Sequence, residues 1–162
     1  MANAPRRCLV GAALASFLLL APSAQAIEVV VFISGMSPEI NWSRGLGGMV
    51  GFGFLKLGAF EAELAHQPGA QLDSGMTSVT GSALFAPSFG PIVPFIGIGV
   101  GAQRQSLGTR SDFGTHSAFV VGAKLKLGGL LVLRAEWRKL GLAGTPPLSV
   151  DDRISGGIGL SF

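Results

Sequence analysis

Few residues of the sequence could act in catalysis or bind a metal, and their spacing does not bring them together in one site. His116 precedes Ser117, which places a base beside a hydroxyl nucleophile, and His66 is the other histidine of the chain. Adjacent side chains on a strand point to opposite faces, so His116 and Ser117 would not share one site. Two histidines without a carboxylate partner are too few for a zinc site. The sequence therefore predicts no catalytic residue and no metal ligand.

Gly97, Gly99 and Ala102 have the spacing of a dinucleotide-binding fingerprint. That fingerprint requires a following amphipathic helix and an acidic residue near position 118, and the sequence has neither. The glycines are better explained as positions that relieve crowding and allow strands to bend. We therefore expect no bound cofactor.

Charged side chains recur at every second position in three segments of the chain. Because successive side chains of a strand alternate between faces, each set lies on one face and its apolar neighbours lie on the other. An Arg or Lys on a lipid-facing surface costs roughly 2–4 kcal/mol near the bilayer midplane, so such charges belong inside a closed structure. The residues are Glu61 and Glu63, then Lys124 and Lys126, then Arg134, Glu136 and Arg138.

Residues 1–26 have the organisation of a secretory signal peptide. Arg6 and Arg7 precede an apolar stretch that is too short to span a bilayer, and small residues lead up to Ala26. We expect cleavage after Ala26 and a single mature domain over 27–162.

Cleavage would also change the chemistry of the chain. The one cysteine, Cys8, would leave with the signal peptide, which excludes disulfides and thiol catalysis from the mature protein. The net charge would fall from +3 to +1, because two of the twelve basic residues are removed. No run of Lys and Arg indicates nucleic-acid binding.

Hydropathy alone would assign a membrane helix to 83–102, since 74–103 contains no charged residue. Pro87, Pro91 and Pro94, together with several glycines, oppose that helix. Every backbone polar group in hydrocarbon needs an internal partner, so a spanning chain without helices must form a closed barrel.

The predicted mature chain divides into eight strands, an even number. We expect an all-β fold, an eight-stranded antiparallel up-and-down transmembrane β-barrel. The predicted strands are 27–34, 46–54, 58–66, 76–86, 92–104, 115–127, 130–140 and 151–162.

The connections between these strands alternate in length. Long outer loops and short periplasmic turns are typical of outer-membrane barrels, and both predicted termini lie on the short-turn side. The predicted long loops are 35–45, 67–75, 105–114 and 141–150.

The charged residues lie at similar heights when they are counted up from the short turns. An eight-stranded barrel is just wide enough for side chains to fill it, and buried charges require partners of opposite sign. We therefore expect an interior charge network that closes the lumen, with Glu28 and Lys126 nearer the periplasmic mouth. The predicted network is Glu61, Glu63, Lys124, Arg134, Glu136 and Arg138.

The last strand ends on an aromatic residue. Ile158, Leu160 and Phe162 share one face of that strand, while Arg153 and its small neighbours share the other. This ending resembles the C-terminal strand of bacterial outer-membrane barrels, which implies that these three residues are read by the outer-membrane assembly machinery.

Aromatic residues gather near the predicted ends of the strands. Such girdles mark the two interfaces of a membrane. We expect a periplasmic girdle of Phe54, Phe60, Phe85, Phe89, Phe95 and Phe162, and an outer girdle of Trp42, Phe113 and Trp137.

Four segments in order, 47–54, 57–64, 94–102 and 133–138, look like successive strands of the opacity-type outer-membrane β-barrel family. The resemblance covers most of the predicted mature chain. It implies a small, porin-family-like protein of the bacterial outer membrane. The chain departs from the pattern in its lack of tyrosine and its short outer loops.

The favoured function is that of a non-enzymatic barrel acting in envelope integrity or in surface interactions through its outer loops. A narrow porin-like channel and, less favoured, a lipid A-modifying enzyme are the alternatives. The expected partners are outer-membrane lipid and lipopolysaccharide, the assembly machinery and an unidentified extracellular ligand.

Overall fold

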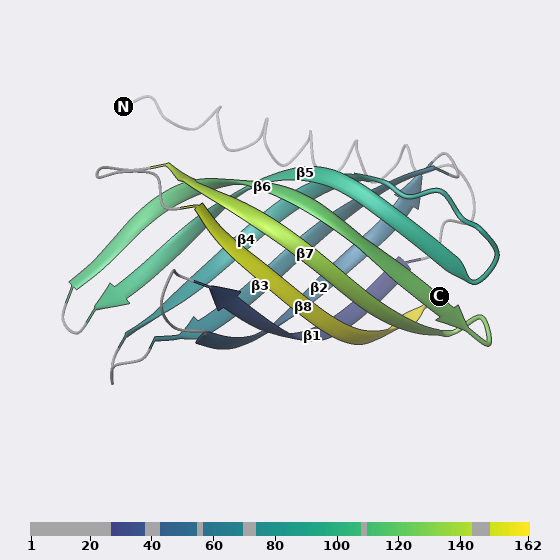
Figure 1. Ribbon diagram of the computed structural model, residues 1–162, viewed down its shortest axis with the longest axis horizontal. Coiled ribbons are helices and arrows are strands. Elements are labelled where there is room, and N and C mark those ends of the chain that lie inside the picture. Colours follow the sequence, from purple (N-terminus) through teal and green to yellow (C-terminus); the bar gives the residue numbers. More distant parts are fainter. Residues whose placement is uncertain (1–26, 38–42, 55–56, 70–73, 108–109, 144–149) are drawn as a thin grey trace, which may run out of the picture.

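A computed structural model describes residues 27–37, 43–54, 57–69, 74–107, 110–143 and 150–162. They form one closed antiparallel barrel in which each strand pairs with the next and the eighth returns to the first, which confirms the predicted fold (Figure 1). No helix in these segments is long and apolar enough to cross a membrane. The strands are β1 (Ile27–Ser37), β2 (Ser43–Phe54), β3 (Gly58–Pro68), β4 (Ser74–Phe85), β5 (Ile92–Leu107), β6 (Arg110–Leu127), β7 (Leu131–Ala143) and β8 (Val150–Ser161).

The first and last strands close the barrel. β1 pairs with β8 along its whole length, from Glu28 opposite Ser161 to Ser37 opposite Asp152. At the end of this seam Ile27 and Phe162 exchange two backbone hydrogen bonds, with N···O distances of 3.1 and 2.9 Å. The sheet therefore has no open edge along this seam.

Both chain ends of the barrel lie at the same end as the β2–β3, β4–β5 and β6–β7 turns. We call this the turn end, and the opposite end the loop end; the C-terminus and the β6–β7 turn lie together at the right of Figure 1. Gly128 and Gly129 form that turn with φ angles of 60° and 81°, and Gly90 in the β4–β5 turn has a φ of 64°. Glycine adopts this left-handed conformation without the steric cost of a Cβ atom.

The barrel is apolar outside and largely polar inside. On β3, Glu61 and Glu63 are buried, whereas Leu64 is 55% exposed on the outer wall. The two-residue period of a strand produces this segregation, because alternate side chains face the lumen and the surroundings. The lumen also holds two clusters of buried apolar side chains, one that includes Phe32 and one that includes Phe95.

The strands extend further toward the loop end than the sequence predicts. The expected loop over 105–114 is wrong, since β5 runs to Leu107 and β6 begins at Arg110. Gln105 pairs with Asp112, so the backbone ladder continues through this segment. Beyond the lipid a strand no longer needs alternating hydrophobicity, and its sequence then looks like that of a loop.

One predicted girdle residue lies elsewhere. Phe95 is 3% exposed inside the lumen and is therefore not part of a periplasmic girdle. Its ring occupies space opposite Gly122, where an added Cβ atom would lie 2.4 Å from the ring. The exposed aromatics Phe85 and Phe89 do lie at the turn end, and Trp42 falls outside the described residues.

Candidate functional site

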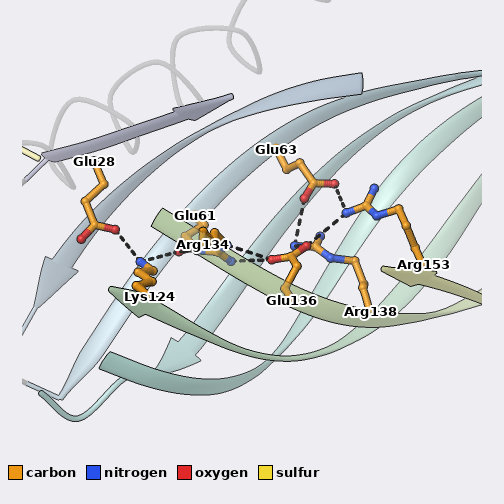
Figure 2. Close-up of polar contacts among 8 residues, drawn as sticks. All are labelled: Glu28, Glu61, Glu63, Lys124, Arg134, Glu136, Arg138 and Arg153. Atoms are coloured by element: carbon orange, nitrogen blue, oxygen red, sulfur yellow. Dashed lines mark hydrogen bonds and ion pairs between the residues drawn. The ribbon is translucent and has the colours of Figure 1, made fainter. Parts of the chain in front are cut away.

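The six residues expected in the lumen all lie there and are connected by ion pairs (Figure 2). Strands β3, β6 and β7 supply them, and each is between 1% and 5% exposed. Residues from β1 and β8 complete the cluster, which we call the lumen network. It consists of Glu28, Glu61, Glu63, Lys124, Arg134, Glu136, Arg138 and Arg153.

The part of the lumen network near the turn end is built around Lys124. Its Nζ contacts Glu28 of β1 and lies 3.0 Å from Oε1 of Glu61 on β3. Lys126 reaches Glu28 over 3.4 Å, and its side chain is partly exposed at the mouth of the barrel. Lys124 on β6 therefore connects β1 and β3 across the lumen through its two ion pairs.

Arg134 occupies the middle of the lumen network. Its two terminal nitrogens lie 2.7 and 2.8 Å from the two carboxylate oxygens of Glu61, a bidentate pair. Its Nε and Nη2 also donate to Glu136 over 3.0 and 2.6 Å. The guanidinium lies 4.2 Å from the centre of the Phe95 ring. Bidentate and stacked contacts of this kind fix the geometry of an arginine.

The part nearest the loop end joins two arginines to two glutamates. Glu63 accepts from Arg153 over 2.6 Å and pairs with Arg138 over 3.0 Å. Glu136 lies 3.2 Å from Arg138 and 3.4 Å from Arg153. The network predicted from the sequence does not include Arg153, although Arg153 lies on the face of the last strand opposite the apolar residues. Its part in this cluster depends on the β7–β8 register, which sets Arg153 opposite Arg138.

The charges of the lumen network balance. Four cations meet four carboxylates, and each of the eight groups has at least one ion-pair partner. Buried charges are costly when one partner is missing, so this pairing is a condition for burying them at all. The pairs cross the lumen and connect β1, β3, β6, β7 and β8 through side chains as well as through the sheet.

The remaining polar residues of interest do not assemble an active site. His116 is buried in the lumen, where its Nε2 lies 2.8 Å from the hydroxyl of Thr80, while Ser117 is exposed on the outer wall. His66 lies outside and pairs with Thr77. Among the described residues, no group of three or more His, Cys, Asp or Glu side chains could hold a metal ion.

The C-terminal strand presents its alternate apolar residues to the outside. Ile158, Leu160 and Phe162 are all exposed on the wall of the barrel. Phe162 is also tied to Ile27 through the backbone, so it lies at the point where the barrel closes.

Known structures share this architecture. Neisserial surface protein A superposes with a TM-score of 0.64 at 15% identity, covering 85% of this chain and 97% of that one. The N-terminal β-barrel domain of Pseudomonas aeruginosa OprF superposes with a TM-score of 0.63 at 13% identity, covering 83% of this chain and 97% of that one. Ail of *Yersinia pestis* gives 0.54 at 15% identity, with 85% and 97% covered.

No protein-family model matches the sequence, and no curated protein matches it. At the identities above, the likeness to solved structures is a likeness of fold. It agrees with the fold implied by the resemblance to the opacity-type family. The chain has the fold of the small eight-stranded outer-membrane β-barrels.

Proposed function

We propose that the chain is a non-enzymatic integral protein of the bacterial outer membrane, with a lumen closed by its own side chains. It acts in envelope integrity or in surface interactions made at the loop end. Residues 1–26 direct export and are removed, and 27–162 form the barrel.

The observation that carries this proposal is the reversed polarity of the barrel. On β5, Ile96, Ile98 and Val100 are 47–73% exposed on the outer wall, while charged groups fill the lumen. A continuous apolar surface of this kind is unfavourable in water, at about 25 cal/mol for each Å². Burial in lipid removes that cost, and in a closed barrel the backbone groups of the strands find their hydrogen-bond partners on neighbouring strands.

The paired charges across the lumen argue against a conducting pore. An eight-stranded barrel leaves little space beyond its own side chains, and here Arg134, Arg138 and Arg153 extend across that space to carboxylates on facing strands. The opposite orientation of His116 and Ser117 argues against a hydrolase that uses this pair, since His116 is buried in the lumen and Ser117 is exposed on the outer wall.

The C-terminal strand serves assembly in the outer membrane. Ile158, Leu160 and Phe162 are read by the outer-membrane assembly machinery, and their exposure on the last strand supports that role. The hydrogen bonds between Ile27 and Phe162 support closure of the barrel as the step that follows recognition.

The loop end is where external partners would bind. Lipid and lipopolysaccharide surround the wall, and an extracellular ligand would contact the connections between strands. Among the structures with this fold, Ail was determined in complex with the heparin analogue sucrose octasulfate, at a TM-score of 0.55 and 15% identity.

Fractionation of cells tests the proposal. The protein should be recovered in the outer membrane and should migrate differently on gels before and after boiling. Purified protein in planar bilayers should show no steady conductance, and deletion of the gene should leave lipid A masses unchanged. Recovery as a soluble periplasmic protein would contradict the barrel proposal, and steady conductance would replace it with the channel.

A further inference from the structure

The apolar outer wall ends in a ring of polar residues on seven of the eight strands. On each of these strands the outward-facing side chains are apolar or small from the turn end up to the first polar one, which lies toward the loop end. All seven residues are exposed. We call them the polar ring: Arg44 on β2, His66 on β3, Thr77 on β4, Arg104 on β5, Ser117 on β6, Lys139 on β7 and Asp152 on β8.

The polar ring carries more positive than negative charge. It holds three basic side chains and one carboxylate, and the described outward-facing residues below it carry no charge. The three cations, Arg44, Arg104 and Lys139, form no ion pair with any described residue, whereas the cations of the lumen network are all paired. An external anion would complement the ring.

The ring lies at the height of a lipid headgroup. On β5 the outward positions run from Ile92 to Ala102 before Arg104 is reached. A transmembrane strand needs about 9–11 residues to cross the hydrocarbon when tilted. Arg104 therefore falls just beyond the apolar band, where phosphate groups of lipids are found.

Arg104 has two polar-ring residues in a row on one side and an aromatic ring on the other. Its strand partners are Thr77 on one side and Phe113 on the other, and its guanidinium lies 5.5 Å from the centre of the Phe113 ring. Thr77 in turn pairs with His66, and their side chains are 2.9 Å apart from Nδ1 to Oγ1. The exposed apolar side chain of Val100 lies two outward positions below Arg104 on the same strand.

We propose that Arg104, with His66 and Thr77 beside it, binds the phosphate of a phosphorylated glycolipid of the lipid A class in the outer leaflet. The guanidinium fork matches phosphate oxygens, and the cation–π contact with Phe113 restricts where the fork can lie. Acyl chains of the same lipid pack on the apolar wall below, around Val100. The inference rests on the proposed outer-membrane location and adds a specific lipid contact to it.

The test uses the purified, folded protein in detergent micelles, titrated with bisphosphorylated lipid A and followed by native mass spectrometry. Arg104→Ala should weaken binding about fivefold, the equivalent of roughly 1 kcal/mol for one basic residue near a charged surface. Arg104→Lys should retain part of the affinity, because the charge remains but the fork is lost. Lys139→Ala is the matched control, because it also removes one positive charge from the polar ring. Lys139 lies opposite Asp152 on the β7–β8 ladder, away from the proposed site, so its loss should weaken binding less.

Two further titrations distinguish the phosphate of lipid A from free phosphate as the group that Arg104 binds. Dephosphorylated lipid A should bind wild type and Arg104→Ala equally, and millimolar inorganic phosphate should not displace lipid A. Equal losses for Arg104→Ala and Lys139→Ala, or displacement by inorganic phosphate, would overturn the lipid site.

Fractionation and the gel shift on boiling, applied to each variant, separate this inference from the proposed function. If the barrel is folded and in the outer membrane but Arg104→Ala binds lipid A as tightly as wild type, the lipid A site is wrong and the proposed function stands. A protein absent from the outer membrane would defeat the proposed function.

Discussion

Arg138 on β7 and Arg153 on β8 are direct partners in the strand register, and both guanidinium groups contact the same two carboxylates, Glu63 and Glu136. Like charges directly opposite one another destabilise a sheet. Here Glu63 reaches them from β3, across the lumen, so its carboxylate compensates two charges at once. The pair of arginines is therefore tolerated only while the carboxylates remain.

Replacing Glu63 by Gln should destabilise the barrel by about 3 kcal/mol, because two buried arginines lose an ionic partner while the shape is kept. Urea unfolding of the protein in lipid vesicles measures the loss. Ser78→Ala is the control, as a buried neutral residue on the neighbouring strand. It should cost about 1 kcal/mol or less. Equal effects of the two substitutions would show that the charge at Glu63 is unimportant.

Glu61 and Arg134 should be strongly coupled, since their four terminal atoms form a bidentate pair. In a double-mutant cycle of Glu61→Gln and Arg134→Met, we expect a coupling free energy of about 2 kcal/mol. The same cycle with Arg104→Met, on the outer wall, should be additive. Additivity for Glu61 and Arg134 as well would contradict the lumen network as a stabilising unit.

Gly122 should not tolerate a side chain. An added Cβ atom would lie 2.4 Å from both the Phe95 ring and the backbone oxygen of Ala135. Gly122→Ala should therefore lower the free energy of unfolding by about 1–3 kcal/mol through overpacking. Gly156→Ala is the matched control, because an added Cβ atom there meets no atom within 4 Å. A Gly122→Ala barrel as stable as the Gly156→Ala barrel would contradict the close approach of Phe95 and Ala135 to Gly122.

Deletion of Phe162 should reduce outer-membrane levels while synthesis and export continue, so that processed protein accumulates in the periplasm. Immunoblots of separated fractions measure this. Phe162→Ala keeps the two backbone hydrogen bonds to Ile27 and removes only the ring, which separates recognition from closure. Phe89→Ala removes another exposed ring at the turn end and should have no effect. Normal outer-membrane levels of both Phe162 variants would argue against the assembly role.

The sequence was sufficient to predict the barrel because charges mark the inner face of three strands. Glu61 and Glu63 on β3, for example, fix which residues of that strand point into the lumen. The alternation of long loops and short turns predicted from the sequence is not kept, because β5 and β6 are joined through 108–109 alone while β4 and β5 are joined through 86–91. The predicted signal peptide over 1–26 stays a prediction, since those residues lie outside the described segments.

The sequence misplaces Phe95 in the periplasmic girdle and omits Arg153 from the lumen network, each for its own physical reason. Phe95 belongs to β5, whose membrane segment is apolar on both faces, so no charge indicates which side is the lumen. Arg153 shares the lumen face by parity, but its contact with Glu63 depends on the stagger between strands. That stagger is a property of the closed barrel and is not encoded in any single strand.

The most direct test of the central claim, that the apolar outer wall of the barrel faces lipid, is fluorescence quenching in outer-membrane fragments. The predicted mature chain has no cysteine, so a label at Val100→Cys on the wall can be compared with one at Ser88→Cys in the exposed β4–β5 turn. The Val100 label should be quenched by spin-labelled lipid and protected from aqueous iodide, and the Ser88 label should show the reverse. Iodide quenching of both labels to the same extent would contradict a barrel wall buried in the membrane.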